Sequence, residues 1–175
     1  MVSSIKYART NDIPFFGICL GMQVAVIEYA RNVLGLTDAN SREFNPDSTN
    51  KVIDFMPGQS DEINKGGTLR LGSYPCEIKE NTKMYECYKT TSIKERHRHR
   101  YEFNNDYKDA LINSGVTICG ESPDKKLVEA IELTSRDFYL GVQFHPEFKS
   151  RPNHPHPLFN GFIKAAIKKK YGKFE

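Results

Sequence analysis

Apolar side chains along this sequence change their spacing near Cys19, and the change marks two different secondary structures. The apolar run at residues 15–19, bounded by Pro14 and Gly21, predicts a short buried strand. From Gly21 to Gly35 the apolar residues recur at helical spacing, at Met22, Ala25, Val26, Tyr29, Ala30 and Val33. Residues 5–9 have the pattern of the end of an earlier helix. The segment around Cys19 is therefore predicted to be a strand, a sharp turn and a helix.

The rest of the chain alternates polar loops with short apolar segments. Residues 38–72 are rich in Asn, Asp, Pro, Gly and Ser, which predicts loops with one short strand around 52–56. Further strands are predicted at 69–79, 95–104, 116–121, 127–133 and 138–144, and a helix at 106–114. A last helix at 158–171 carries lysines toward its C-terminal end, where cations oppose the helix dipole. The pattern predicts one α/β domain, with a mostly parallel or mixed sheet flanked by helices.

Composition limits the classes of protein that fit this pattern. The 175 residues are enough for one domain with its own core, and 25 basic against 22 acidic residues give no indication of nucleic-acid binding. No apolar run approaches the length of a membrane span, and no signal peptide is recognisable, so we expect a cytoplasmic protein without a membrane partner. The four cysteines contain no C-x-x-C pair, which favours reduced thiols over zinc or disulfides.

The sequence GICLG places Cys19 between two glycines, at the junction of the predicted strand and helix. This spacing matches a nucleophile elbow, a sharp turn in which flanking side chains would collide with the neighbouring strand and helix. A helix N-terminus also favours the thiolate form of cysteine. A buried cysteine acting as a small hydrophobic residue fits the motif equally well. Cys19 is thus a candidate nucleophile that needs a partner.

A candidate partner lies in GVQFHPEF, where an apolar strand ends at His145 and Glu147. A thiol nucleophile needs a base of near-neutral pKa, and an imidazole needs an acceptor that fixes its tautomer. The turn at Pro146 could bring the carboxylate to the ring. For an isolated motif, a strand-end histidine beside a solvated glutamate would be the simpler interpretation. Together with the elbow, however, the motif favours a Cys-His-Glu catalytic group.

The run RHRHR at residues 96–100 alternates two residue types along a predicted strand. Alternation of period two sends its arginines to one face and His97 and His99 to the other. The run fits a phosphate or nucleic-acid strip, a pair of metal ligands, or an exposed strand with salt bridges. No third ligand stands at a suggestive spacing, so we predict no metal site.

Several of these motifs together carry a family resemblance. GICLGMQ followed by GVQFHPEF resembles the class I glutamine amidotransferases, which hydrolyse glutamine to glutamate and ammonia. The stretches NVLGLTDANSREF, GGTLRLG, ERHRHRYEFN and HPEFKSRPNHPHPLF are similar to the glutaminase domain of CTP synthases. The resemblance covers about residues 5–166. It implies the flavodoxin-like fold of class I glutamine amidotransferases.

The resemblance also implies a role for each matching residue. Cys19 would attack the side-chain amide carbon of glutamine, His145 would protonate the departing ammonia, and Glu147 would orient His145. The N–H of Leu20 would stabilise the oxyanion. The positions that match the family's glutamine-binding residues are Gln23, Glu43, Arg100 and the backbone of Tyr101.

The wider family suggests partners that lie outside this chain. CTP synthases are ligases of pyrimidine nucleotide biosynthesis. Their N-terminal synthetase (amidoligase) domain uses ATP and Mg²⁺ to aminate UTP with the ammonia. GTP acts as an effector near the RHRHR and GGTLRLG segments. The enzymes form homo-oligomers. Nothing in this sequence resembles the nucleotide-binding segments of that domain, so no cofactor is expected in residues 1–175.

The resemblance also predicts what the chain lacks. The first strands of the family domain, and a glycine-rich loop that supplies another oxyanion donor, are expected to be missing, so the domain is predicted to be incomplete at its N-terminal side. Two alternatives therefore stay open. One is a stand-alone γ-glutamyl hydrolase or peptidase, and the other is a binding or regulatory module without turnover.

Overall fold

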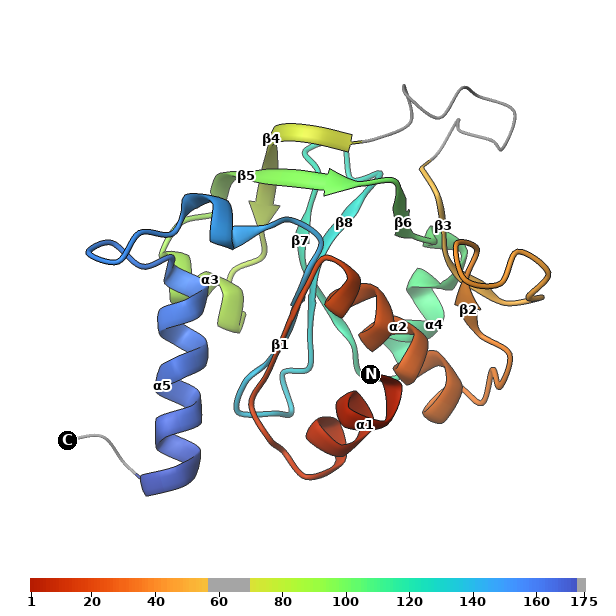
Figure 1. Ribbon diagram of the computed structural model, residues 1–175, viewed down its shortest axis with the longest axis horizontal. Coiled ribbons are helices and arrows are strands. Elements are labelled where there is room, and N and C mark those ends of the chain that lie inside the picture. Colours follow the sequence, from red (N-terminus) through yellow and green to blue (C-terminus); the bar gives the residue numbers. More distant parts are fainter. Residues whose placement is uncertain (57–69, 173–175) are drawn as a thin grey trace.

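The computed structural model describes residues 1–56 and 70–172 (Figure 1). Its helices are α1 (Val2–Thr10), α2 (Leu20–Asn32), α3 (Lys83–Tyr88), α4 (Lys108–Asn113) and α5 (Pro157–Tyr171), with the short 3-10 turns η1 (Asn105–Tyr107) and η2 (Pro146–Lys149). Its strands are β1 (Phe15–Ile18), β2 (Asn40–Ser41), β3 (Lys51–Phe55), β4 (Arg70–Ile78), β5 (Ser92–His99), β6 (Tyr101–Phe103), β7 (Thr117–Glu121), β8 (Val128–Glu132) and β9 (Tyr139–Val142).

The larger sheet has six strands in the order β1-β9-β8-β7-β4-β5. Strands β1 and β9 are parallel, with Ile18 opposite Val142, whereas the other four pairings of this sheet are antiparallel. The predicted mixed α/β sheet is therefore confirmed, although antiparallel pairings outnumber parallel ones among the described strands. Consecutive strands β7, β8 and β9 follow one another by short connections, which is the arrangement that antiparallel pairing allows.

A second, three-stranded sheet of β2, β3 and β6 lies beside the first. The sequence predicted one strand over residues 95–104, and this prediction was wrong. The chain instead leaves the six-stranded sheet after His99, turns at Arg100, and enters the smaller sheet at Tyr101, where Phe55 is its partner. The apolar and polar pattern runs through both strands, so it contains no signal of the change of sheet.

Two apolar clusters cover the two faces of the six-stranded sheet. On β9 the side chain of Tyr139 packs into the cluster with α1 and α2, whereas the next residue, Leu140, packs into the cluster with α3 and α5. Successive strand residues point to opposite faces, so this short strand contributes to both cores. A partly buried ion pair between Arg9 and Glu28, with a Nε–Oε2 distance of 2.8 Å, joins α1 to α2.

The remaining helices agree with the sequence pattern except at two places. Helix α3 was not predicted. Its N-terminus is capped by the hydroxyl of Thr82, which accepts a hydrogen bond from the N–H of Tyr85, and it ends at Lys89 in the left-handed region. Val33, predicted to belong to the apolar face of α2, follows the end of that helix and is 40% exposed.

Part of the loop predicted at residues 38–72 and the first residue of the strand predicted at 69–79 lie outside the described residues, as does most of GGTLRLG. Within the described part of the chain, no helix is long and apolar enough to cross a membrane.

Candidate active site

Cys19 occupies a strained turn between β1 and α2. Its backbone has φ +50° and ψ −104°, a conformation that side-chain-bearing residues rarely adopt outside functional turns. A Cβ atom at Gly17 would lie 2.7 Å from the backbone carbon of Gly21, so only glycine fits at Gly17. A Cβ atom at Gly21 itself would meet open space, and the collision predicted there does not occur. The predicted elbow is therefore present, with Gly17 as its steric requirement.

The predicted thiolate at Cys19 is not supported. Partial burial raises the pKa of the Cys19 thiol to about 11, because a thiolate would lose contact with water. The N–H of Leu20 at the start of α2 acts in the opposite direction, as the sequence suggested, but it is outweighed. The nearby carboxyls of Glu102 and Glu147 add to the increase. Cys19 is thus a neutral thiol, and it would need a base in order to act as a nucleophile.

The parallel pairing of β1 with β9 brings residues from both ends of the sequence to Cys19. The N–H of Cys19 donates to the carbonyl of Val142 at 2.7 Å, and Nε2 of Gln143 lies 3.6 Å from the Cys19 sulfur. His145 follows two residues later, at the same end of the sheet. The side chain of Gln143 is fully buried. Sequence reasoning missed Gln143, although it stands within GVQFHPEF, because a buried amide gives no periodic signal.

His145 and Glu147 form the contact that the sequence predicted. The turn η2 folds Glu147 back so that its Oε1 lies 2.6 Å from Nδ1 of His145. The N–H of His145 donates to the carbonyl of Arg96 at 2.8 Å, and Phe148 stacks on the imidazole. The second ring nitrogen, Nε2, is buried and has no hydrogen-bond partner within residues 1–56 and 70–172. A carboxylate at Nδ1 orients the imidazole and leaves Nε2 to exchange protons.

A cavity of about 450 Å³ opens at Cys19. All five residues that the resemblance assigns to glutamine line it, together with three others. The assigned residues are Leu20, Gln23, Glu43, Arg100 and Tyr101; the others are Phe44, Arg98 and His99. They come from α2, from the loop after β2, and from the turn between β5 and β6. The cavity therefore presents a thiol, a carboxylate and guanidinium groups to a single small ligand.

Gln23 holds one wall of this cavity in place. Its side chain is 3% exposed, and its Nε2 donates to the carbonyl of Tyr101 at 2.9 Å and to Oε1 of Gln143 at 3.1 Å. The amide hydrogens of Gln23 are thus used within the protein. Gln23 joins the elbow helix, the β6 strand and the segment that leads to His145.

The RHRHR strand has the alternation that the sequence predicted. Arg96 and Arg98 are exposed, whereas His97 is 1% and His99 is 5% exposed. Nδ1 of His97 lies 2.8 Å from Nε2 of His99. Within the described ranges, no group of three His, Cys, Asp or Glu side chains could hold a metal ion.

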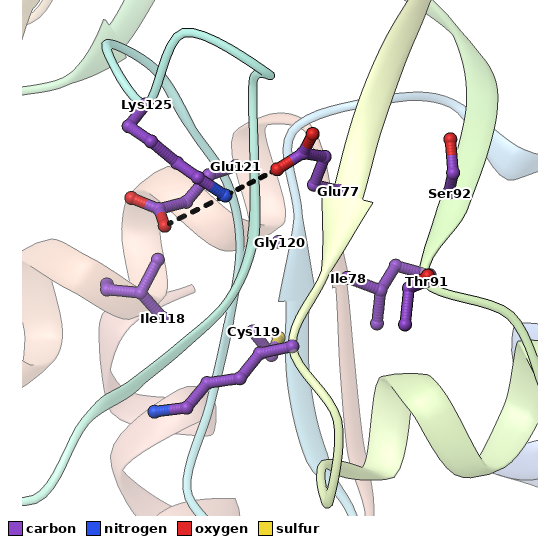
Figure 2. A pocket seen from close by; sticks show the side chains of 10 residues that line it. Glu77, Ile78, Thr91, Ser92, Ile118, Cys119, Gly120, Glu121 and Lys125 are labelled. Atoms are coloured by element: carbon purple, nitrogen blue, oxygen red, sulfur yellow. Dashed lines mark hydrogen bonds and ion pairs between the residues drawn. The ribbon is translucent and has the colours of Figure 1, made fainter.

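A second cavity, of about 430 Å³, lies where β4 and β7 meet over only two residue pairs (Figure 2). Figure 2 shows Lys125 between Glu77 and Glu121, and its Nζ is 2.7 Å from Glu77 Oε2 and 4.0 Å from Glu121 Oε2. With Lys79, the lining has two lysines and two glutamates, so its charges balance, and it offers less to a charged ligand than the cavity at Cys19 does. We therefore take the cavity at Cys19 as the candidate active site.

An elbow cysteine, a strand-end His–Glu pair and a mixed sheet with helices on both faces define a class of protein. The glutamine amidotransferase class-I family matches residues 1–165, and the chain belongs to this family.

Within this class, the chain is similar to CTP synthases. It is 58% identical over 166 residues to the CTP synthase of Nostoc punctiforme, covering 95% of this chain and 30% of that protein. It is also 58% identical over 172 residues to the enzyme of Clostridium beijerinckii, covering 98% of this chain and 32% of that protein. The chain thus spans about a third of the length of these curated relatives.

The solved structures agree with this relationship. The glutaminase domain of the Trypanosoma brucei CTP synthase, with bound acivicin, superposes with a TM-score of 0.90 at 42% identity, covering 99% of this chain and 69% of that one. A putative GMP synthase subunit from Thermoplasma acidophilum has a TM-score of 0.60 at 16% identity, covering 96% of this chain and 64% of that one, and shares the fold. The fold and the family predicted from the sequence are therefore confirmed.

Proposed function

We propose that this chain is the glutaminase part of a CTP synthase and hydrolyses L-glutamine through Cys19, His145 and Glu147. The observation that carries the proposal is the cavity at Cys19, whose lining includes every residue that the family resemblance assigns to glutamine. The close likeness to the trypanosomal glutaminase domain supports it. The alternative of a γ-glutamyl hydrolase or peptidase leaves Glu43 and the RHRHR strand unexplained.

The first half of the reaction forms a thioester. Because the Cys19 thiol is neutral, His145 Nε2 takes its proton as the sulfur attacks the amide carbon of glutamine. Glu147, 2.6 Å from Nδ1, holds the imidazole and balances the positive charge that develops on it. The tetrahedral oxyanion receives a hydrogen bond from the N–H of Leu20. His145 then protonates the amide nitrogen, the C–N bond breaks, and ammonia leaves.

The second half releases glutamate. Water attacks the thioester carbon while His145 removes one of its protons, the C–S bond breaks, and the proton returns to the Cys19 sulfur. Glutamine and water are thus converted to glutamate and ammonia. The α-ammonium group of the substrate fits the carboxylate of Glu43, and the α-carboxylate fits the guanidinium of Arg100.

The role of the whole enzyme extends beyond this chain and is part of the proposal. The ammonia would aminate UTP to CTP in a synthetase domain that uses ATP and Mg²⁺, which places the protein in pyrimidine nucleotide biosynthesis as a nucleotide-binding ligase. GTP as an effector, assembly into homo-oligomers and a cytoplasmic location rest on the same resemblance. No residue of this chain is assigned to ATP or Mg²⁺.

The test is active-site labelling, because it reads both the nucleophile and the substrate. We expect a diazo-ketone analogue of glutamine to label Cys19 alone among the four cysteines of the full chain, as mapped by mass spectrometry. Glutamine should protect Cys19, and asparagine should protect it poorly, since one methylene less moves the amide away from the sulfur. Acivicin, which is bound in the trypanosomal structure, serves as a second probe.

A simple alkylating agent supplies the matched control. Cys87 is partly exposed like Cys19, and burial raises the pKa of its thiol to about 11 as well, so iodoacetamide should label the two at similar slow rates. Selectivity for Cys19 should therefore appear only with the glutamine analogue. Equal labelling of Cys19 and Cys87 by the analogue, or equal protection by asparagine and glutamine, would refute the proposal. Glutamate formation by the full chain then measures turnover.

A further inference from the structure

Five ionisable side chains form a closed ring behind the cavity. They are Arg70 on β4, His97 and His99 on β5, Glu102 on β6 and Glu129 on β8, and none is more than 6% exposed. Starting from Arg70, the successive distances are 2.6 Å to Glu129, 3.6 Å from Glu129 to His97, 2.8 Å from His97 to His99, 3.4 Å from His99 to Glu102, and 3.6 Å from Glu102 back to Arg70.

The ring includes the residues on either side of the turn that faces the cavity. His99 directly precedes Arg100, and Glu102 directly follows Tyr101, so the contact between His99 and Glu102 closes around the two residues that face the cavity. The turn is also the point where the chain changes from one sheet to the other. The strand pairings reach His99 on one side of this turn and Tyr101 on the other, and side-chain contacts at His99 and Glu102 add to them. Arg70 on β4 and Glu129 on β8 connect the contact between His99 and Glu102 to two further strands.

Stability alone is a poor reason for such a ring. Burying charged groups costs more than their attraction returns unless the geometry is very good, and apolar side chains of similar volume often stabilise a core as well or better. Here the contacts are imperfect, because both carboxylate oxygens of Glu102 and of Glu129 lack a partner with hydrogen-bond geometry among the described residues. A buried polar group of this kind calls for a functional explanation.

The protonation states follow from burial and from the single guanidinium. Burial, with the charge of Arg70, lowers the pKa of His97 to about 2 and of His99 to about 3, so both imidazoles are neutral. Burial raises the pKa of Glu102 to about 8 and of Glu129 to about 7. Arg70 lies nearer to Glu129 than to Glu102, so Glu129 ionises first as the pH rises, and Glu102 remains mainly the neutral acid at pH 7. With Glu129 ionised and Glu102 neutral, the ring carries no net charge.

We propose that this ring is a positioning device that fixes Arg100 and Tyr101 at the cavity and thereby sets the affinity for glutamine, an inference that rests on the proposed function. Glu102 is its positioning residue at the substrate side. It acts through the turn and not on the reacting atoms. The ring should therefore affect binding more than the chemical step at Cys19.

Labelling kinetics of the full chain separate the binding of the diazo-ketone analogue from its reaction with Cys19. We measure the maximal rate at which the diazo-ketone analogue labels Cys19, and the analogue concentration that gives half of that rate. Glu102→Ala should raise the half-saturating concentration about tenfold or more and change the maximal rate less than about threefold. Glu102→Gln mimics the neutral acid and should stay within about twofold of the unaltered chain at pH 7.

Glu132→Ala is the matched control. Glu132 is also a buried carboxyl on β8, but its oxygens accept hydrogen bonds from the N–H groups of Lys83 and Met84 at the start of α3, away from the cavity. It should lower stability without changing the half-saturating concentration. If Glu132→Ala and Glu102→Ala raise this concentration equally, or if Glu102→Ala leaves it unchanged, the ring does not position the turn.

A pH series decides the question even if Glu102→Ala does not fold. Above pH 8, Glu102 of the unaltered chain ionises against Glu129 and near Cys19, and the other ionisable groups that face it among residues 1–56 and 70–172 are Arg70 and the neutral His97 and His99. The half-saturating concentration should then rise about threefold relative to that of Glu102→Gln between pH 7 and 9. If the half-saturating concentrations of the unaltered chain and of Glu102→Gln change equally between pH 7 and 9, the proposal is wrong. Failure of glutamine to protect Cys19 in the unaltered chain would instead refute the proposed function.

Discussion

Two groupings of histidine with carboxylate lie at the same end of this protein, and their surroundings differ. In the pair of His145 and Glu147, the side chains are 19% and 45% exposed and meet through one contact of 2.6 Å. In the ring of Arg70, His97, His99, Glu102 and Glu129, the side chains are almost completely buried, and the contacts between histidine and carboxylate are 3.4 and 3.6 Å.

The comparison teaches that residue type alone does not assign a chemical role. The partly exposed pair has one short hydrogen bond, and Nε2 of His145 has no hydrogen-bond partner among the described residues, which suits the pair to the proton exchange that we propose. In the ring, burial holds both imidazoles neutral and raises the pKa of the carboxyls, to about 7 for Glu129 and about 8 for Glu102, so the histidines there do not exchange protons at neutral pH. We thus propose that the same two residue types serve chemistry in one place and geometry in the other.

The largest effect should come from the exposed pair. We expect His145→Gln to lower glutamate formation about 10⁴-fold or more, because the thiol loses its base, while the free energy of unfolding changes by less than about 1 kcal/mol. Glutaminase assays and urea titration of the full chain measure the two quantities. His154→Gln, at an exposed histidine outside the site, is the control and should leave both unchanged. Retained turnover in His145→Gln would exclude this histidine as the base.

A change in the ring, unlike one in the exposed pair, should have a large effect on the free energy of unfolding. Glu129→Ala leaves buried Arg70 with the longer contact to Glu102 as its remaining ion pair among the described residues, so we expect the free energy of unfolding to fall by about 3–5 kcal/mol. Urea titration measures this loss. Glu147→Ala is the comparison from the exposed pair and should change stability by less than about 1 kcal/mol. Equal losses in the two variants would remove the distinction between the groupings.

The smallest effect is a dependence of stability on pH. The folded pKa of Glu102, about 8, exceeds the ordinary carboxyl value of 4.5, so its contribution is fully present below pH 4.5 and is lost as the pH rises through 8. The lowered pKa values of His97 and His99 act in the other direction only below about pH 6.5. Between pH 6.5 and 8 the free energy of unfolding should therefore fall. The slope is up to about 1.4 kcal/mol per pH unit for each carboxyl proton that the folded chain holds and the unfolded chain has released.

The variant Glu102→Gln tests the origin of this slope. Glutamine cannot ionise, so urea midpoints taken across pH 6.5–8 should fall less steeply in the variant than in the unaltered chain. Identical slopes would show that Glu102 does not titrate in this window.

Local signals made much of the fold and site predictable. Gly17 and Gly21 around Cys19 predicted a turn between strand and helix, and HPE predicted the contact of His145 with Glu147, because each depends on neighbours in the sequence. The alternation of RHRHR likewise predicted which side chains face inward. The roles of these residues in catalysis stay predictions, since they are supported by position and family resemblance.

Features that depend on distant partners could not be predicted. The change of sheet at Arg100 is determined by β3, which lies far away in the sequence, and the burial of Glu102 and Glu129 follows from it. The predicted thiolate form of Cys19 was wrong for the same reason. The sequence shows the helix that stabilises a thiolate, but it does not show the packing that removes water from the sulfur. Helix α3 depends on Glu132, some fifty residues later, to accept its first N–H groups.

The parallel pairing of β1 with β9 also determines when the site can exist during synthesis. Cys19 and its elbow leave the ribosome more than a hundred residues before Val142, Gln143 and His145. A nascent chain therefore holds Cys19 without His145, and on the proposed mechanism it releases no ammonia before β9 has paired with β1. Because such long-range pairing forms late in folding, the proposed activity begins only after these two strands have paired.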